Sequence, residues 1–420
     1  MNQRQYKRGG KAISTLILNK TSYSKSPYDL WLKDLEEPIV MLTSTERLNE
    51  CKNYDQIESF DEYPINGCIE IRALELHETY RFHTIIAMSE YDLLRAGKLR
   101  THLGVEGQSY ESALLFRNKV LMKQRLEEAG VPVPPYRKIE SSVDLYLFVQ
   151  QFGFPVVVKP IDGSGSVGTK VLKNESDLMK YLSKGLSENM EVETFVEGDM
   201  YHIDGMLIDG HMTLNWPSRY INGCLAFQEE QFLASYQLGA DNPLTSRLTD
   251  IVEKALKALP SPKTTTFHAE VFHTPDDKLV FCEIASRTGG GLIREATQQG
   301  FGFDLNEVCV KKQCGLSYDI PNDSQLKRGP KQLSGWILIP PKHGRLVKVP
   351  SIPFENWVTK QKISAKEGEI FQGASSSVDV VSSYLIKGDS EDVLINRIHQ
   401  VASWCSEHMI WEGQSTWSLK

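Results

Sequence analysis

The stretch that decides the fold is residues 265–287, which read TTFHAEVFHTPDDKLVFCEIASR. Two runs rich in aromatic and β-branched residues, 267–273 and 279–284, flank the turn TPDDK. This pattern predicts an antiparallel hairpin with its turn centred between Asp276 and Asp277. Because side chains alternate between the two faces of a hairpin, one face is expected to be core and the other polar.

Two carboxylates share the polar face of this hairpin. Glu270 and Glu283 lie at equal distances from the turn centre, so their Cβ atoms are expected about 5 Å apart. Like charges so placed destabilise a sheet unless a cation lies between them, and Mg²⁺ (or Mn²⁺) prefers carboxylate and phosphate oxygens. The alternatives are a solvated face or one protonated carboxylate. The same face is expected to carry His268, Phe272, Phe281 and Ala285, and the core face Phe267, Ala269, Val271, Val280, Cys282 and Ile284.

A glycine-rich loop lies upstream, between two short strand patterns. The strand at 156–158 leads into Lys159 and then into DGSGSVG at 162–168. Glycines allow positive φ angles and let backbone N–H groups approach an anion, and Ser164 and Ser166 add hydroxyl donors. The loop lacks the ending of a Walker A motif, so a flexible turn is the alternative, but Lys159 at its mouth favours phosphate binding.

Two further features follow the hairpin directly. Arg287 lies four residues after Glu283, where it would neutralise a transferred phosphoryl group or a tetrahedral oxyanion. Its alternative role is an ion pair with Glu283. Gly289, Gly290 and Gly291 precede a predicted helix and form a second candidate anion nest, which would suit a substrate carboxylate.

One long helix is predicted from Tyr110 to about Ala129, where Gly130 ends it. Lys119 and Lys123 lie on this helix, four residues apart. Their local sequence alone indicates two solvated surface lysines.

Composition limits the classes of function. The chain has 420 residues with 47 basic and 54 acidic side chains, a net charge of −7, which excludes a globally basic nucleic-acid binder. No run approaches the roughly 18 apolar residues that span a membrane. The seven cysteines are scattered without a CxxC pair, which favours reduced thiols and a cytoplasmic protein.

Taken together, these segments resemble the ATP-grasp superfamily. The resemblance covers residues 85–320 closely, and the order and spacing of its segments carry it. Within the superfamily the chain is most similar to bacterial L-amino acid ligases, which make dipeptides, and to relatives that load an amino acid onto a carrier protein in antibiotic biosynthesis. The segments are FRNK at 116–119, VVKP at 157–160, the loop 162–168, ETFVEG at 193–198, Glu270, and EIASR at 283–287.

The resemblance implies an α/β (α+β) chain with the ATP-grasp fold. It comprises a Rossmann-like parallel-sheet unit at 1–110, an ATP-grasp unit at 111–325 and a small α+β unit at 326–420. The ATP-grasp unit divides into a part that includes the nucleotide-covering subdomain, 111–190, and a metal and substrate part, 191–325. Strand and helix patterns that alternate in the first unit independently predict its parallel sheet.

The resemblance also implies residue roles. Glu270 and Glu283 would hold Mg²⁺, and Arg287 would stabilise an acyl phosphate and the tetrahedral intermediate. Two lysines and the glycine loop would bind the phosphates of ATP. The segment 193–196 would be the hinge that binds the adenine. The residues implied to bind ATP are Lys119, Lys159, Gly163, Ser164, Gly165, Ser166, Val167, Gly168, Glu193, Phe195 and Val196.

Three positions depart from the pattern of the superfamily. Asn118 stands where many members have Asp, and Ala285 stands where a metal-binding Asn is common. Met200 occupies the position of a frequent ribose-binding Glu, which leaves Asp204 or Glu197 as ribose candidates.

The implied reaction activates an amino acid carboxylate as an acyl phosphate, with ATP converted to ADP and phosphate. The acceptor is either the amine of a second amino acid or the phosphopantetheine thiol of an acyl carrier protein. A non-catalytic nucleotide-binding protein is the third interpretation, against which the retained lysines, glutamates and arginine argue. Small-molecule amino acids are the expected partners, with no nucleic acid and no membrane.

Overall fold

The N-terminal part forms a parallel sheet, as the strand and helix patterns predict. The structure, a computed structural model, describes residues 13–413. Its first four strands pair in the order β3-β2-β1-β4, every pair parallel. The elements of this part are β1 (Ser14–Asn19), α1 (Tyr28–Trp31), β2 (Ile39–Ser44), η1 (Thr45–Glu50), β3 (Gln56–Phe60), α2 (Cys68–Tyr80), β4 (Phe82–Ala87) and α3 (Leu93–Leu103).

The single helix expected from Tyr110 to about Ala129 is wrong. Two helices, α4 (Tyr110–Arg117) and α5 (Lys119–Glu128), meet at a break. Asn118 has extended backbone angles there, and its side-chain oxygen accepts a hydrogen bond from the Leu121 N–H at 3.0 Å. Asn therefore acts as an N-cap that restarts the chain in a new helix. The break places Lys119 at the first turn of α5.

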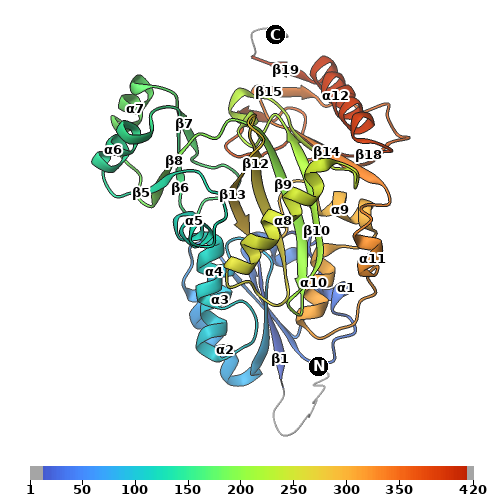
Figure 1. Cartoon of the computed structure of the whole chain (residues 1–420). Coiled ribbons are helices and arrows are strands. Elements are labelled where there is room, and N and C mark those ends of the chain that lie inside the picture. Colours follow the sequence, from blue (N-terminus) through green and yellow to red (C-terminus); the bar gives the residue numbers. More distant parts are fainter. Residues whose placement is uncertain (1–12, 414–420) are drawn as a thin grey trace.

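Residues 136–194 form a separate lobe, which projects to the left in Figure 1. Its four antiparallel strands pair in the order β5-β8-β6-β7, with two helices on one face. Both helices begin after a capping side chain, since Ser141 accepts from the Asp144 N–H and Asn174 accepts from the Asp177 N–H. The elements are β5 (Tyr136–Ile139), α6 (Ser142–Phe152), β6 (Val156–Pro160), β7 (Lys170–Leu172), α7 (Glu175–Leu182) and β8 (Met190–Thr194).

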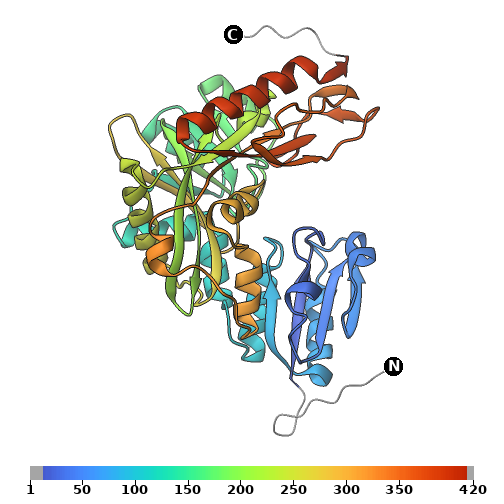
Figure 2. The same ribbon diagram turned by 90° about the vertical axis from the view of Figure 1, so that its right-hand side faces the viewer.

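An eight-stranded sheet forms the centre of the molecule. Its order is β13-β12-β9-β10-β11-β14-β18-β16, so strands from the predicted C-terminal unit extend the sheet that holds the hairpin. Figure 2 shows the last long helix, α12, running along the top of the molecule. The strands are β9 (Asp199–Ile208), β10 (His211–Ile221), β11 (Leu233–Gln237), β12 (Thr265–His273), β13 (Leu279–Ala285), β14 (Leu333–Ile339), β16 (Val358–Ile363) and β18 (Ser382–Gly388).

The remaining elements are helices and a further, smaller sheet formed by the C-terminal residues of the chain. A three-stranded sheet of order β17-β15-β19 accompanies α12. The elements are η2 (Ala226–Glu229), α8 (Pro243–Ala258), α9 (Ile293–Phe301), α10 (Leu305–Gln313), α11 (Asp323–Leu326), β15 (His343–Lys348), β17 (Ile370–Gln372), α12 (Glu391–His408) and β19 (Ile410–Glu412).

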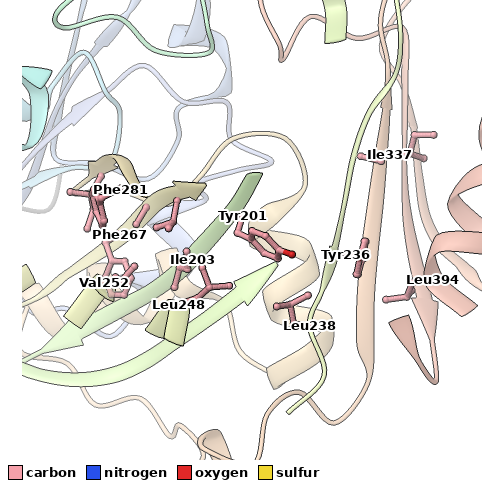
Figure 3. Close-up of a cluster of buried hydrophobic side chains, with 14 of the residues drawn as sticks. Tyr201, Ile203, Tyr236, Leu238, Leu248, Val252, Phe267, Phe281, Ile337 and Leu394 are labelled. Atoms are coloured by element: carbon pink, nitrogen blue, oxygen red, sulfur yellow. The ribbon is translucent and has the colours of Figure 1, made fainter. Parts of the chain in front are cut away.

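One face of the central sheet is apolar core. Leu248 and Val252 from α8 pack against Phe267 and Phe281 of the hairpin, as Figure 3 shows. Because α8 covers this face, the polar side chains of the hairpin are left on the opposite face.

The hairpin register confirms the pairing of Glu270 with Glu283 but changes the faces near the turn. A bulge after Glu270 pairs Val271 with Phe281, one position out of the predicted register. Such an extra residue reverses the alternation of the bulged strand. Phe281 is therefore fully buried in the core, and Cys282 lines a cavity on the other face, the reverse of the expectation for both.

Within the part of the chain that the structure describes, no helix combines the length and apolarity needed to cross a membrane.

Candidate active site

A cavity of about 660 Å³ lies between the lobe and the central sheet. This volume suits a small-molecule ligand. The glycine loop (residues 162–168), the lobe strands and the polar face of the hairpin all contribute to its walls. The predicted site residues that line it are Lys119, Lys159, Gly163, Ser164, Ser166, Val167, Glu193, Phe195, Val196, Glu270 and Glu283.

Glu270 and Glu283 face this cavity from adjacent strands. Lys119 Nζ lies 3.3 Å from Glu283 Oε2, and the Tyr220 hydroxyl donates to Glu270 Oε1 at 3.3 Å. Burial alone would raise the pKa of Glu283, but Lys119 and Lys159 lower it to about 2. Two co-facial carboxylates beside a nucleotide-sized cavity are the oxygen donors that Mg²⁺ takes together with phosphate. The residues present therefore fit a magnesium site.

A buried cluster of two lysines and two glutamates adjoins the cavity, which two of its members, Lys159 and Glu193, also line. Lys159 Nζ is 2.6 Å from Glu193 Oε1, and Lys123 Nζ is 2.7 Å from Glu191 Oε1. Lys123 also donates to Glu193, which therefore bridges both lysines. The four charges balance, so the cluster holds Lys159 in place at the mouth of the glycine loop.

The surface positions indicated for Lys119 and Lys123 by local sequence are wrong. Lys119 is 6% exposed and Lys123 is 0% exposed. Their carboxylate partners lie more than 60 positions away, on β8 and β13, so the local sequence carries no sign of them. Lys119 faces the cavity, as the superfamily resemblance implies, whereas Lys123 was not among the predicted site residues.

Electrostatics fix the charge states of this cluster. Burial opposes the charge of Lys159, but Cys282 and the neighbouring glutamates raise its pKa well above the usual value. Burial likewise opposes ionisation of Glu193, yet Lys123 and Lys159 lower its pKa. Burial dominates at Glu191 and raises its pKa, in keeping with a buried Oε2 that has no hydrogen-bond partner in the described residues.

The glycine loop carries the backbone angles expected of an anion-binding loop. Gly165, Ser166 and Gly168 all have positive φ. Lys119 Nζ donates to the Gly163 carbonyl at 2.7 Å, which joins the loop to α5. Gly165 and Gly168 do not line the cavity itself, although they belong to the same turn.

Arg287 pairs with Glu90 rather than with Glu283, the ion-pair partner considered from sequence. Glu90 follows β4 of the N-terminal sheet and also accepts from Arg117. Burial opposes the charge of Arg287, but Glu90, Glu283 and Glu270 raise its pKa. Arg287 lies outside the lining of the main cavity, Glu90 orients its side chain, and nothing local in the sequence signalled this ion pair.

Gly289, Gly290 and Gly291 lie outside the lining of the main cavity. Beneath Gly289, Asp204 accepts from His202 Nδ1 at 2.5 Å and from His268 Nδ1 at 2.8 Å. These separations are those of direct hydrogen bonds. The donor atoms of ligands that share one metal at about 2.0 Å lie roughly 3.3 Å apart, so His202, Asp204 and His268 are arranged as a hydrogen-bonded group and not as a metal site.

The ribose candidates separate in the structure. Asp204 is 3% exposed and held by two imidazoles, so it does not face the nucleotide cavity. Glu197 lines the cavity directly after the candidate hinge residues Phe195 and Val196. The sequence did not single out the other cavity side chains, chiefly Cys224, Tyr220 and Cys282.

Comparison with known proteins agrees with this geometry. Residues 124–291 match the ATP-grasp domain. The L-arginine-specific L-amino acid ligase of Bacillus subtilis is 26% identical over 343 residues, which cover 76% of this chain and 79% of the relative. The crystal structure of L-amino acid ligase from Bacillus licheniformis has a TM-score of 0.76 at 15% identity, covering 96% of this chain and 100% of that chain.

A third match concerns a structure with bound nucleotide. The biotin carboxylase domain of Hydrogenobacter thermophilus 2-oxoglutarate carboxylase, in complex with MgADP, has a TM-score of 0.67 at 14% identity. It covers 95% of this chain, and the chain covers 90% of it. At these identities the solved structures show the shared fold alone.

The chain therefore contains an ATP-grasp domain at residues 124–291, and over most of its length it is similar to an enzyme that ligates amino acids.

Proposed function

We propose that the enzyme joins the carboxylate of one amino acid to the amine of another, and so makes a dipeptide. The observation that carries this proposal is the convergence of Lys119, Lys159 and the glycine loop on the cavity that Glu270 and Glu283 line. Such a site neutralises a triphosphate and a carboxylate at the same time. The similarity to an L-amino acid ligase over 79% of that relative supports the choice of substrates.

The reaction has two steps. An oxygen of the substrate carboxylate attacks the γ-phosphorus of ATP, ADP leaves, and an acyl phosphate forms. The amine nitrogen of the second amino acid then attacks the acyl carbon, phosphate leaves, and the nitrogen loses a proton. Mg²⁺, when held by Glu270 and Glu283, supplies positive charge to the phosphates.

The residues of this chain position the reactants and balance their charge. Lys119 and Lys159 neutralise phosphate oxygens, and Glu193 and its neighbours keep Lys159 aimed at them. Arg287, oriented by Glu90, neutralises the charge that develops on the phosphoryl group and on the tetrahedral oxyanion. The glycine loop covers the acyl phosphate and excludes water.

Loading of a carrier protein gains no support, because none of the relatives described above is named as acting on one. We place the reaction in the cytoplasm. Within residues 13–413 all seven cysteines are free thiols, which suits a reducing compartment.

The experiment that tests the proposal uses purified protein with Mg-ATP and the twenty amino acids, singly and in pairs. ADP, phosphate and a dipeptide in equal amounts are expected for at least one pair. K159M should abolish the product, whereas K257M, at an exposed ion pair on α8, should retain it. AMP and pyrophosphate would instead mean that the carboxylate is adenylated. ADP and phosphate without an amide would refute an amine as the acceptor.

A further inference from the structure

A serine-rich loop from the C-terminal part of the chain lies against the site. Residues 373–379 read GASSSVD and connect β17 to β18; we term them the serine loop. The Ser377 N–H donates to the Gly165 carbonyl at 3.0 Å, across 212 positions of sequence. The glycine loop is therefore docked onto a segment that neither the cavity nor the motifs include.

The same contact includes side chains. A Cβ atom at Gly165 would lie 3.8 Å from both Ser377 Oγ and Val378 Cγ2, which is van der Waals distance. Val378 also reaches the triple-glycine loop (residues 289–291), because a Cβ atom at Gly290 would lie 3.2 Å from Val378 Cγ1. Val378, whose side chain is partly exposed, thus lies next to both loops that the sequence identified as anion-binding candidates.

The serine loop is held firmly on its own side. Asp379 Oδ2 accepts hydrogen bonds from the Ser375 N–H at 2.8 Å, the Ser375 hydroxyl at 2.6 Å and the Ser376 N–H at 3.1 Å. Two residues further on, the Val381 N–H donates to the Ile339 carbonyl at 2.8 Å, which ties the loop to the central sheet. A rigid loop rooted in a sheet is a suitable surface for a second loop to close against.

We propose that the serine loop is the latch that holds the glycine loop closed during catalysis, with Ser377 and Val378 as its positioning residues. This inference rests on the proposed function for its chemical consequence. When the latch is loose, water rather than the amine attacks the acyl carbon, phosphate leaves, and the amino acid is regenerated. The net reaction is then hydrolysis of ATP to ADP and phosphate without an amide.

Two variants separate the backbone bond from the side-chain packing. S377P removes the N–H that donates to Gly165, whereas S377A keeps it and serves as the matched control. V378A removes the two Cγ methyl groups that lie next to the glycine loop and the triple-glycine loop, and it keeps the backbone unchanged. Loss of one hydrogen bond is expected to weaken closure about five-fold.

Hydrogen exchange of amides 162–170 in the full chain with Mg-ADP reads closure directly. Protection should fall about five-fold in S377P, in keeping with one lost hydrogen bond, should fall in V378A, and should stay at the wild-type level in S377A. The ratio of ADP to dipeptide should rise in S377P and V378A. Unchanged protection in both S377P and V378A would overturn the latch. If S377P fails to fold, V378A alone decides.

The two proposals fail in different ways. If no amino acid pair yields an amide with the wild-type protein, the proposed function fails, whereas the exchange comparison with Mg-ADP still decides the latch. If amide forms and both S377P and V378A leave the exchange and the ADP-to-dipeptide ratio unchanged, the latch fails and the proposed function stands.

Discussion

Replacement of Lys123 by Met tests the buried charge cluster most directly. Lys123 is 0% exposed and pairs with Glu191 and Glu193, while Lys159 supplies the only other positive charge among the four residues. K123M leaves this cluster with a net buried negative charge. Removing one partner of a buried ion pair costs about 3–5 kcal/mol. With about 2–4 °C of melting temperature per kcal/mol, the midpoint should fall by roughly 10 °C.

Thermal unfolding followed by circular dichroism, without nucleotide, provides the assay. K257M is the matched control, because Lys257 is in an ion pair with Glu253 on α8 but its side chain is 73% exposed. Such a pair contributes at most about 1 kcal/mol. The double variant K123M/E191Q restores neutrality and should recover part of the loss. The reasoning is refuted if K123M melts within 1 °C of the wild-type protein, or if the double variant is no more stable than K123M.

Three further outcomes are expected. E283Q should weaken binding of Mn²⁺ in the presence of ADP, measured by electron paramagnetic resonance, and unchanged affinity would contradict the metal assignment. R287M should lower kcat by about 10²–10³ with little change in the Kd for ATP; equal losses in both would point to nucleotide binding instead. Burial opposes the charge of His268, but Asp204 outweighs it and raises the pKa of His268 from 6.5 to about 10. The charged imidazole therefore stabilises the folded state fully below pH 6.5, and this stabilisation is lost progressively as the pH rises to about 10. The difference in melting temperature between the wild-type protein and H268Q, without metal, should therefore shrink over that range, and a constant difference would count against the charge on His268.

Local sequence signals predicted those parts of the fold that local physics decides. The alternating strand and helix patterns of the first unit predicted its parallel sheet, and the structure has that sheet. Glu270 and Glu283 were placed opposite each other by the turn alone, and their register confirms that placement. The predicted turn centre, between Asp276 and Asp277, is wrong, because the pairs next to the turn centre on Asp276.

The burial of Lys123 could not be predicted in this way. Its carboxylate partners lie 68 and 70 positions away, on a strand whose position depends on the whole lobe. Glu90 is still more remote from Arg287, at 197 positions. A charged residue carries no local sign that it will be buried, because burial depends on a partner that only the fold supplies.

The bulge in the hairpin shows a different kind of limit. Because the pairs next to the turn centre on Asp276, the extra residue Cys282 on β13 brings Glu270 opposite Glu283 and moves Phe281 into the core. The alternating pattern alone is compatible with either register near the turn. Packing of Phe281 against α8 favours the bulged register. In that register Cys282 Sγ lies 3.9 Å from Lys159 Nζ.

The pairing of charges explains how an acidic chain can accept a triphosphate. Lys119 is paired with Glu283, Lys159 with Glu193, and Arg287 with Glu90. Each of these cations already has a carboxylate partner, and a phosphate that takes Lys119 leaves the Glu283 carboxylate without its counter-charge. Burial makes that state costly, since Glu283 faces Glu270 across the hairpin. A divalent cation that arrives with the nucleotide removes this cost, because it replaces the lysine at Glu283 while it neutralises the phosphates. The nucleotide and the metal are therefore expected to bind as one unit, in which the metal takes over the role of Lys119 at Glu283.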